Sequence, residues 1–343
     1  MATNPEKPDF KKQFRAMVQG SQSLTVAYIG VVNDLFAALK RLGTGDVAAI
    51  ATATRMDAGY VRRWCDAAFA FGYLNAEGEL FRLSEMGAAM SPDAPNTLMP
   101  LPMTMVSSVH MAVRSASLMR RGERPGETVM AEVETLLPWF GAMLEGTFAR
   151  FFEEKICPGV PIFAEIDERG GLVVDLGCGN GWYLRVLARR CGSIRGLGLD
   201  AFEENVAQAT RLAQEEGLGD RLHFIRGDAR EFKLDRPADL IAMNRALHHV
   251  WEGGVAPFIR RLRDSLRPGG AVAIWEPDWP SDRSILRKPA LRGLALQNLN
   301  EHVQGNHLLR ADQIAEAFAA EGLAPEISRF ADGIEAIIVA RRV

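Results

Sequence analysis

Short apolar runs alternate with amphipathic stretches between residues 171 and 277, and no other feature of the chain limits its fold as strongly. The runs that have the character of buried strands are GLVVDLG (171–177), IRGLGLD (194–200), RLHFIRGD (221–228), ADLIAMN (238–244) and AVAIWEP (271–277). This alternation of strands and helices predicts a parallel sheet with helices on both faces. Residues 324–343 read as two strands joined by a turn at Asp332–Gly333, which adds an antiparallel hairpin. We therefore expect an α/β fold with a doubly wound, mostly parallel seven-stranded sheet and an antiparallel terminal hairpin.

The first ninety residues have a different texture. Apolar residues recur at helical spacing over 23–43, where Gly43 ends the predicted helix, and further helices are predicted over 46–55 and 57–74. The segment 75–85 then carries a turn signal and alternating apolar residues, typical of a small ribbon. Helix, turn, helix and ribbon is the pattern of a winged helix. We expect an N-terminal winged-helix domain that is all-helical apart from this ribbon.

The 343 residues are enough for two domains, and 48% of them are apolar, as in ordinary globular proteins. Nine of the 13 methionines lie between Met86 and Met143. Because methionine fills irregular apolar space, this zone is predicted either to line an adaptable substrate pocket or to form inter-domain core. The predicted domains are a winged-helix-like dimerisation domain (1–91), a helical linker or cap (92–164) and a ligand-binding domain (165–343).

The balance of charge excludes several classes of partner. The chain has 40 basic and 43 acidic side chains, and its first ninety residues hold ten Lys and Arg against nine Asp and Glu. The winged helix therefore lacks the basic excess of a DNA-binding module. No stretch is apolar enough to cross a membrane as one helix, and the polar N-terminus shows no targeting segment. We expect no nucleic acid, no membrane and a cytoplasmic location, which the four widely spaced cysteines also fit.

The stretch VVDLGCGNGWYL (173–184) carries the most specific chemistry. A predicted strand ends near Asp175, and Gly177, Gly179 and Gly181 then turn the chain into a helix. Glycines let the backbone approach a ligand closely, and a helix N-terminus presents free N–H groups and a positive dipole. Asp200 closes the next strand, where a carboxylate can accept hydrogen bonds from a ribose diol. A nucleotide-like or carboxylate-bearing ligand is expected at this point.

A nicotinamide dehydrogenase would share these features, and the glycine spacing disfavours it. The dinucleotide fingerprint G-x-G-x-x-G/A needs a small sixth residue so that helix and strand pack closely. Counted from Gly177, the sixth residue here is Trp182, and the spacing is G-x-G-x-G. The dehydrogenase remains only as a less favoured alternative.

Two further strand ends complete the pattern. The triplet GDA (227–229) follows the third strand, and Asn244 ends the fourth. With the glycine loop, Asp200 and the terminal hairpin, these residues make the region 165–343 resemble the class I S-adenosylmethionine-dependent methyltransferases. With its winged-helix start, the whole chain is similar to the two-domain small-molecule methyltransferases that dimerise through their N-terminal domains. The stretches GYVRRWCDAAFAFGYL and ALHHVWEGGVAPFIRRLRDSLRPGG look similar to an actinobacterial branch of that group, which implies secondary metabolism.

The resemblance also implies which residues bind the cofactor, S-adenosylmethionine. The positions that match the family pattern are Asp175, Gly177, Cys178, Gly179, Asp200, Ala201, Gly227, Asp228, Ala229 and Asn244. The backbone from Gly177 to Gly179 would hold the methionine part, and Asp200 would bind the ribose hydroxyls. Asp228 and its neighbours would meet the adenine edge, which Phe202 would flank.

Histidines follow the fourth strand, at the end of the sheet where ligands of such folds bind. We predict His248 as the catalytic residue, because histidine suits the role of general base at neutral pH. An alternative is a divalent metal held by His248, Glu276 and His302, since two histidines and a carboxylate can leave open positions for a chelating substrate. That arrangement resembles the α-keto acid C-methyltransferases.

We therefore expect a homodimeric enzyme that transfers a methyl group from S-adenosylmethionine to an O, N or C atom of a small-molecule metabolite. One alternative is a metal-dependent α-keto acid C-methyltransferase. Another is a ligand-sensing winged-helix regulator, which the near-neutral first ninety residues disfavour.

Overall fold

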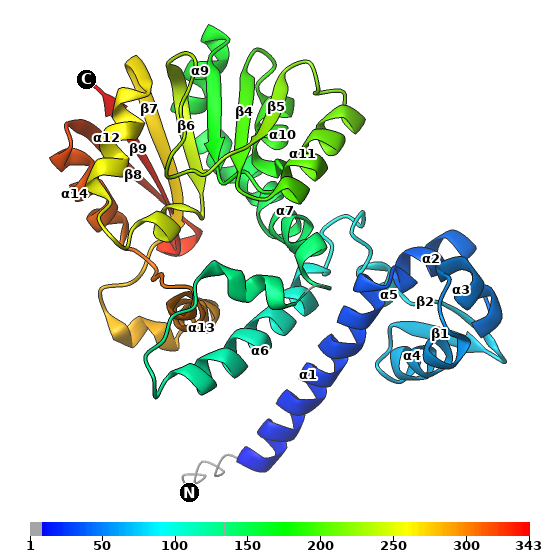
Figure 1. Cartoon of the computed structure of the whole chain (residues 1–343). Coiled ribbons are helices and arrows are strands. Elements are labelled where there is room, and N and C mark those ends of the chain that lie inside the picture. Colours follow the sequence, from blue (N-terminus) through cyan, green and yellow to red (C-terminus); the bar gives the residue numbers. More distant parts are fainter. Residues whose placement is uncertain (1–8, 134) are drawn as a thin grey trace, which may run out of the picture. The chain divides into compact units, whose positions relative to one another are not determined.

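The computed structural model describes residues 9–133 and 135–343 (Figure 1). The chain divides into two compact units. Unit 1 comprises the chain up to His110 together with residues 133–146, and unit 2 comprises residues 111–132 and 147–343. The stretch predicted as a linker or cap, 92–164, is shared between the units, and the predicted three-domain division stays a prediction.

Unit 1 consists of helices and one two-stranded sheet. Its elements are α1 (Phe10–Val32), α2 (Leu35–Leu42), α3 (Val47–Thr54), α4 (Ala58–Ala70), β1 (Leu74–Glu77), β2 (Leu80–Leu83), α5 (Glu85–Ala88), the first part of α6 (Pro100–Leu118), η2 (Leu137–Trp139) and the first part of α7 (Phe140–Phe151). Asp46 and Asp57 begin α3 and α4 by accepting backbone N–H groups of Ala49 at 2.8 Å and Tyr60 at 3.0 Å. The antiparallel pair β1–β2 forms the predicted ribbon.

The helix predicted over 23–43 is wrong in its start and its continuity. α1 begins at Phe10, and the chain breaks between α1 and α2, where Asp34 adopts a left-handed conformation with φ of +53°. Aspartate tolerates that conformation better than most residues, which favours a turn at this point. Gly43 ends α2 as predicted, with φ of +70°.

Unit 2 contains the large sheet. Its elements are the rest of α6, η1 (Glu127–Glu132), the rest of α7, η3 (Phe152–Ile156), α8 (Cys157–Gly159), α9 (Ile162–Arg169), β3 (Leu172–Leu176), α10 (Trp182–Arg190), β4 (Arg195–Asp200), α11 (Glu203–Glu215), β5 (Leu222–Arg226), β6 (Ala238–Asn244), η4 (Leu247–Val250), α12 (Ala256–Asp264), β7 (Leu266–Pro277), η5 (Arg283–Arg287), α13 (Pro289–Val303), α14 (Ala311–Ala320), β8 (Leu323–Phe330), η6 (Ala331–Gly333) and β9 (Glu335–Arg342). The predicted strands appear within two residues of their predicted bounds, except that β7 begins at Leu266, five residues before its predicted start.

The seven strands form one sheet in the order β5-β4-β3-β6-β7-β9-β8 (Figure 1). The strands from β5 to β7 are mutually parallel, and β9 runs antiparallel to both β7 and β8. This confirms the predicted doubly wound sheet with its terminal hairpin. The strand order reverses between β3 and β6, and ligands of such sheets bind beyond the carboxyl ends of the strands at this reversal.

The core of unit 2 is built from the strands and the helices packed on them. Val174, Ile241, Val272 and Ile338 come from four adjacent strands and are fully buried. Burial on both faces explains why these strands are apolar throughout instead of alternating. The core therefore fixes the ends of β3, β6 and β7 relative to one another.

Among the described residues, no single helix has the length and apolar character needed to span a bilayer. The bent pair α1 and α2 passes that test jointly, by length and composition alone.

Candidate active site

Two strand ends meet at the reversal of the sheet. Asp175 lies in β3 one residue before its end, and Asn244 ends β6. The Asn244 side-chain amide donates a hydrogen bond of 3.0 Å to Asp175 Oδ1. Burial, and to a lesser extent the nearby charge of Asp200, raise the pKa of Asp175 to about 8 although the Asn244 hydrogen bond opposes this. The Asp175 carboxyl group is therefore mostly neutral at pH 7.

The glycine loop is anchored to β4. Gly177 N–H and Cys178 N–H both donate to the carbonyl of Leu199, at 2.8 and 2.9 Å, and Gly179 N–H donates to Asp200 Oδ2 at 2.8 Å. The free N–H groups expected from the motif are thus already paired at these three positions. A side chain at Gly179 would point into open space, so its absence leaves room beside the backbone. Burial raises the pKa of the Cys178 thiol, which favours a role for its backbone alone.

Gly181 explains why the sixth motif position can be bulky. A Cβ atom at Gly181 would lie 2.6 Å from the ring of Phe224, so it is the fifth position that allows α10 to pack closely. Trp182 is buried and contacts the rings of Tyr183 and Trp275 at centroid distances of 6.0 and 6.1 Å. The indole is part of the core beneath the loop.

Asp200 is the hub of the loop. Besides Gly179 N–H, its carboxylate accepts the Phe202 N–H and the Asn205 side-chain amide, each at 3.0 Å. A carboxylate offers about four acceptor positions. Three positions are filled, so one is left for a ligand hydroxyl. A second would become free only if the Asn205 hydrogen bond were broken. Asn205 was not among the predicted residues, although its place in the first turn of the helix after Asp200 is a signal that could have found it.

The residues predicted to flank adenine lie at the ends of β4 and β5. Gly227 N–H donates to the backbone carbonyl of Asp200 at 2.9 Å, which ties the two strand ends together. Asp228 is exposed and accepts the Arg230 N–H at 2.7 Å, while Ala229 is half-buried. Ala201 and Phe202 are exposed. The cofactor-binding positions predicted from the motif therefore lie at the carboxyl ends of neighbouring parallel strands.

These residues fit S-adenosylmethionine. Asp175 and Asp200 are buried acids, and Asp200 accepts the N–H of Gly179 in the glycine loop. A ligand that carries a sulfonium and an ammonium group would favour the ionised form of the Asp175 carboxyl. The acceptor-rich chemistry of the loop thus suits a cationic ligand with hydroxyl groups.

A buried histidine–glutamate pair lies at the ends of β6 and β7. His248 Nδ1 is 2.9 and 3.0 Å from the two carboxylate oxygens of Glu276, and Leu247 N–H donates to the same carboxylate at 2.9 Å. Burial alone would raise the pKa of Glu276, but the charge and hydrogen bond of His248 outweigh it and lower the pKa. An ionised carboxylate only accepts hydrogen bonds, so His248 Nδ1 carries the proton and Nε2 faces away from Glu276.

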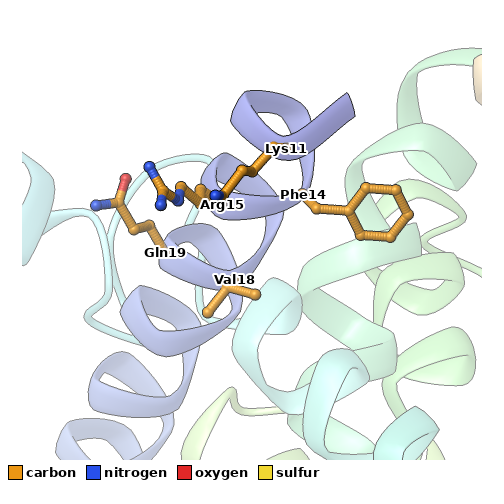
Figure 2. A pocket seen from close by; sticks show the side chains of 5 residues that line it. All are labelled: Lys11, Phe14, Arg15, Val18 and Gln19. Atoms are coloured by element: carbon orange, nitrogen blue, oxygen red, sulfur yellow. The ribbon is translucent and has the colours of Figure 1, made fainter. Parts of the chain in front are cut away.

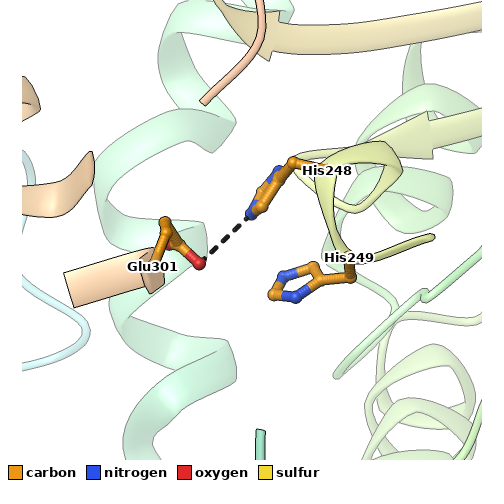
Figure 3. Close-up of side chains that lie close together, drawn as sticks. All are labelled: His248, His249 and Glu301. Carbon is orange, nitrogen blue, oxygen red and sulfur yellow. Dashed lines mark ion pairs between the residues drawn. The ribbon is translucent and has the colours of Figure 1, made fainter. Parts of the chain in front are cut away.

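Glu301 on α13 faces the other nitrogen of His248 (Figure 3). Its Oε2 lies 3.7 Å from His248 Nε2, and its carboxylate also accepts the side-chain amide of Gln304 at 3.1 Å. Burial alone would lower the pKa of His248, but Glu276 and Glu301 together raise it. His248 is thus held between two acids.

The metal ligands predicted from sequence are not brought together. His302 is exposed, whereas Glu301, one residue earlier and about 100° around the helix, points at His248. Glu276 holds the opposite nitrogen of His248. Among the described residues, His248, His249 and Glu301 instead place one possible ligand atom each within 4.8 Å of the others. Two imidazoles and a carboxylate suit a divalent transition metal.

Part of the chain is similar in sequence to known methyltransferases. Residues 173–270 match the family described as "Methyltransferase domain". A trans-aconitate 2-methyltransferase of Streptomyces avermitilis is 38% identical over 142 residues, which is 40% of this chain and 52% of that protein. The Escherichia coli protein YjhP, described as uncharacterized, is 40% identical over 111 residues, 32% of this chain and 43% of that protein. The chain spans about half the length of these curated relatives.

Solved structures match over nearly the whole chain. An O-methyltransferase family protein from Burkholderia thailandensis has a TM-score of 0.70 at 18% identity, covering 98% of this chain and 99% of that one. Human N-acetylserotonin methyltransferase in complex with S-adenosylmethionine has a TM-score of 0.72 at 20% identity, covering 99% of both chains. Residues 173–270 thus match a methyltransferase domain, and the chain has the fold of class I S-adenosylmethionine-dependent methyltransferases, as the sequence resemblance implied.

Proposed function

We propose that this chain transfers a methyl group from S-adenosylmethionine to an O, N or C atom of a small-molecule metabolite. The observation that carries the proposal is the meeting of a glycine loop with Asp175 and Asp200 at the reversal of the sheet. The matched methyltransferase domain covers the same residues. The chemistry of the relatives supports a small molecule as the acceptor, since trans-aconitate and N-acetylserotonin are named in their descriptions.

When bound, S-adenosylmethionine supplies a methyl group that its sulfonium already activates, so the chain has to align the acceptor, exclude water and remove a proton. In the proposed site, the loop from Gly177 to Gly179 holds the methionine part, and Asp200 accepts a ribose hydroxyl. His248 is the proposed catalytic residue. Its Nε2 takes the acceptor proton while Glu276 fixes the ring and stabilises the imidazolium that forms.

Labelled methyl transfer tests the proposed function. The protein is incubated with S-adenosylmethionine that carries a tritiated methyl group and with fractionated small-molecule extracts, and label in new products is counted. The proposal predicts label with the wild type and with Glu203→Ala, whose side chain is exposed beside the site, and at least about a hundredfold less with Asp200→Ala. Equal labelling by the wild type and Asp200→Ala would contradict it.

A metal-assisted C-methylation of an α-keto acid is the second candidate, because His248, His249 and Glu301 lie within reach of one ion. In that case the metal would bind the adjacent oxygens of the acceptor. Elemental analysis of protein purified without chelator, repeated on His248→Ala, separates the candidates. About one metal ion per wild-type chain and a clear loss in the variant would favour this candidate, and a metal-free wild type would reject it.

We further propose that the chain forms a homodimer through its N-terminal unit. Phe10, Phe14, Met17 and Val18 are each more than half exposed, and their spacing places them on one stripe of α1. Figure 2 shows Phe14 and Gln19 projecting from different sides of this helix. Lys11, Arg15 and Gln19 form a polar stripe beside the apolar one. An apolar stripe exposed next to a polar one suits a helix that packs against a second copy.

A cytoplasmic location and a role in secondary metabolism complete the proposal. The four cysteines are free thiols, which is the state expected in a reducing compartment. The resemblance to an actinobacterial small-molecule branch supports the metabolic role.

A further inference from the structure

We propose that Arg245 is a positioning residue whose guanidinium, clamped between Glu335 and the ring of Phe148, holds the turn that presents His248 to Glu276. The inference rests on the proposed function, because it matters for catalysis only if His248 is the catalytic residue. Arg245 lies directly after β6, three residues before His248, and no sequence motif pointed to it.

The backbone of Arg245 is strained. Its φ is +55°, a left-handed conformation that disfavours residues with a Cβ and that glycine adopts freely. A glycine would relieve this strain, yet the chain has an arginine here. Such strain persists only where the surroundings hold the residue firmly, and it is common at functional sites.

Three contacts hold the Arg245 side chain. Its Nη2 pairs with Glu335 Oε1 at the start of β9, and both side chains are nearly buried, at 13% and 11% exposed. Its guanidinium carbon lies 3.9 Å from the centre of the Phe148 ring and 5.8 Å from that of Trp275. A guanidinium stacked on an aromatic face and paired with a carboxylate is well fixed in orientation.

The contacts close a circuit through Trp275. The backbone N–H of Arg245 donates to the Trp275 carbonyl at 2.7 Å, and Trp275 Nε1 donates to Glu335 Oε2 at 2.7 Å. Arg245 is thus attached to β7 through its backbone and to β9 through its side chain. The turn after β6 therefore cannot shift without breaking a buried ion pair or a buried hydrogen bond.

The circuit ends next to the catalytic pair. Trp275 immediately precedes Glu276, and the turn after Arg245 contributes Leu247 N–H, His248 N–H and His248 Nδ1, all of which face the Glu276 carboxylate at 2.9 to 3.3 Å. Fixing Arg245 against Trp275 therefore fixes donor and acceptor together. A distance change of even a few tenths of an ångström would weaken these hydrogen bonds.

Packing alone does not account for an arginine at this position. Arg245 Nε is buried and has no hydrogen-bond partner among the described residues. Leaving a buried donor unpaired is unfavourable, and an apolar side chain could fill the space between Phe148 and Trp275 without that penalty. We therefore attribute the arginine at this position to its role in holding the turn that carries His248.

The test uses the full chain with chelator present and needs no acceptor. Arg245→Gly keeps the left-handed backbone accessible and removes the clamp, and Glu335→Gln removes the ion pair while Arg245 remains. Arg341→Gln is the matched control, because Arg341 pairs with Glu165 and lies where β9 pairs with the opposite end of β7. The readouts are the proton resonance of His248 Nδ1–H, assigned by its loss in His248→Ala, and hydrogen exchange of the Leu247 and His248 amides.

The proposal predicts that Arg245→Gly and Glu335→Gln each abolish or shift the Nδ1–H resonance. Each should also speed exchange of the two amides by about tenfold or more, and the double variant should be no worse than either single variant. Arg341→Gln should change neither readout. Unchanged exchange in both site variants, or equal acceleration across unit 2, would overturn the proposal. Failure of S-adenosylmethionine to bind the wild type would instead sink the proposed function and leave these readouts as they are.

Discussion

At the scale of single residues, the protonation state of Asp175 should change when S-adenosylmethionine binds. Its pKa of about 8 means that the free protein holds a proton there at neutral pH. A cationic ligand beside the carboxyl group favours the ionised form, so binding should release that proton. The affinity for S-adenosylmethionine should therefore rise with pH, by at most about tenfold per unit, and level off above about pH 8.

Calorimetry at several pH values, in buffers with different heats of ionisation, measures both the affinity and the released proton. Asp175→Asn should remove the pH dependence, and Asp167→Asn should leave it in place, because Asp167 lies on α9 and accepts the Ser193 N–H at 2.7 Å before β4 begins. A pH-independent affinity in the wild type would refute the role given to Asp175.

The Glu276–His248 pair should stabilise the fold within a defined pH window. The pKa of Glu276 is lowered, so its contribution is complete above about pH 4.5 and is lost as the pH falls through the folded value. The pKa of His248 is raised, so its contribution is complete below about pH 6.5 and is lost as the pH rises through the folded value. Glu276→Gln should therefore lower the free energy of unfolding most between pH 4.5 and 6.5, by about 3 kcal/mol. Urea unfolding at pH 5.5 and 9 checks this, and an equal loss at both values would speak against a charged pair.

At the scale of elements, α13 decides which side chain reaches His248. Glu301 and His302 are neighbours in sequence, but Glu301 is buried at the site and His302 is exposed. Glu301→Gln should lower the rate of labelled methyl transfer by about tenfold or more, because it removes a charge that supports the imidazolium. His302→Gln, the matched control, should stay within about twofold of the wild type. A larger loss of rate in His302→Gln than in Glu301→Gln would indicate that His302, and not Glu301, acts on His248.

The strands and the glycine loop could be predicted because their signals are local. A strand, three glycines and a helix follow one another within residues 172–190, and Asp200 and Asn244 simply end the next strands. α13 lacks such a signal. Leu291, Leu294 and Val303 are buried, while Leu296 and Leu299 are 42% and 46% exposed, so its apolar residues mark no single face. The register that selects Glu301 over His302 comes from tertiary packing.

Contacts between residues far apart in the sequence could not be predicted either. Arg245 finds Glu335 ninety residues away, and His249 lies against Asn306 with 2.8 Å between Nδ1 and the amide nitrogen. A single sequence contains no sign of which acid an isolated arginine will meet. The break between α1 and α2 at Asp34 was also missed, because helical periodicity continues on both sides of it.

At the scale of the whole molecule, the proposed dimer should depend on the apolar stripe of α1. Phe14→Glu places a charge in that stripe, and Gln19→Glu places the same charge in the polar stripe. Sedimentation equilibrium should show the dimer dissociation constant raised by about thirtyfold or more in the first variant and little changed in the second. A wild type that stays monomeric, or two variants that behave alike, would rule out this interface.

The most direct test is isothermal titration calorimetry, in which S-adenosylmethionine is titrated into the wild type, Asp200→Ala and Glu203→Ala. We predict one site per chain in the wild type and in Glu203→Ala. The affinity should fall by about thirtyfold or more in Asp200→Ala, because that variant loses the proposed ribose acceptor and the partner of Gly179 N–H. No binding heat with the wild type, or an undiminished affinity in Asp200→Ala, would contradict the assignment of the cofactor site to the carboxyl ends of these strands.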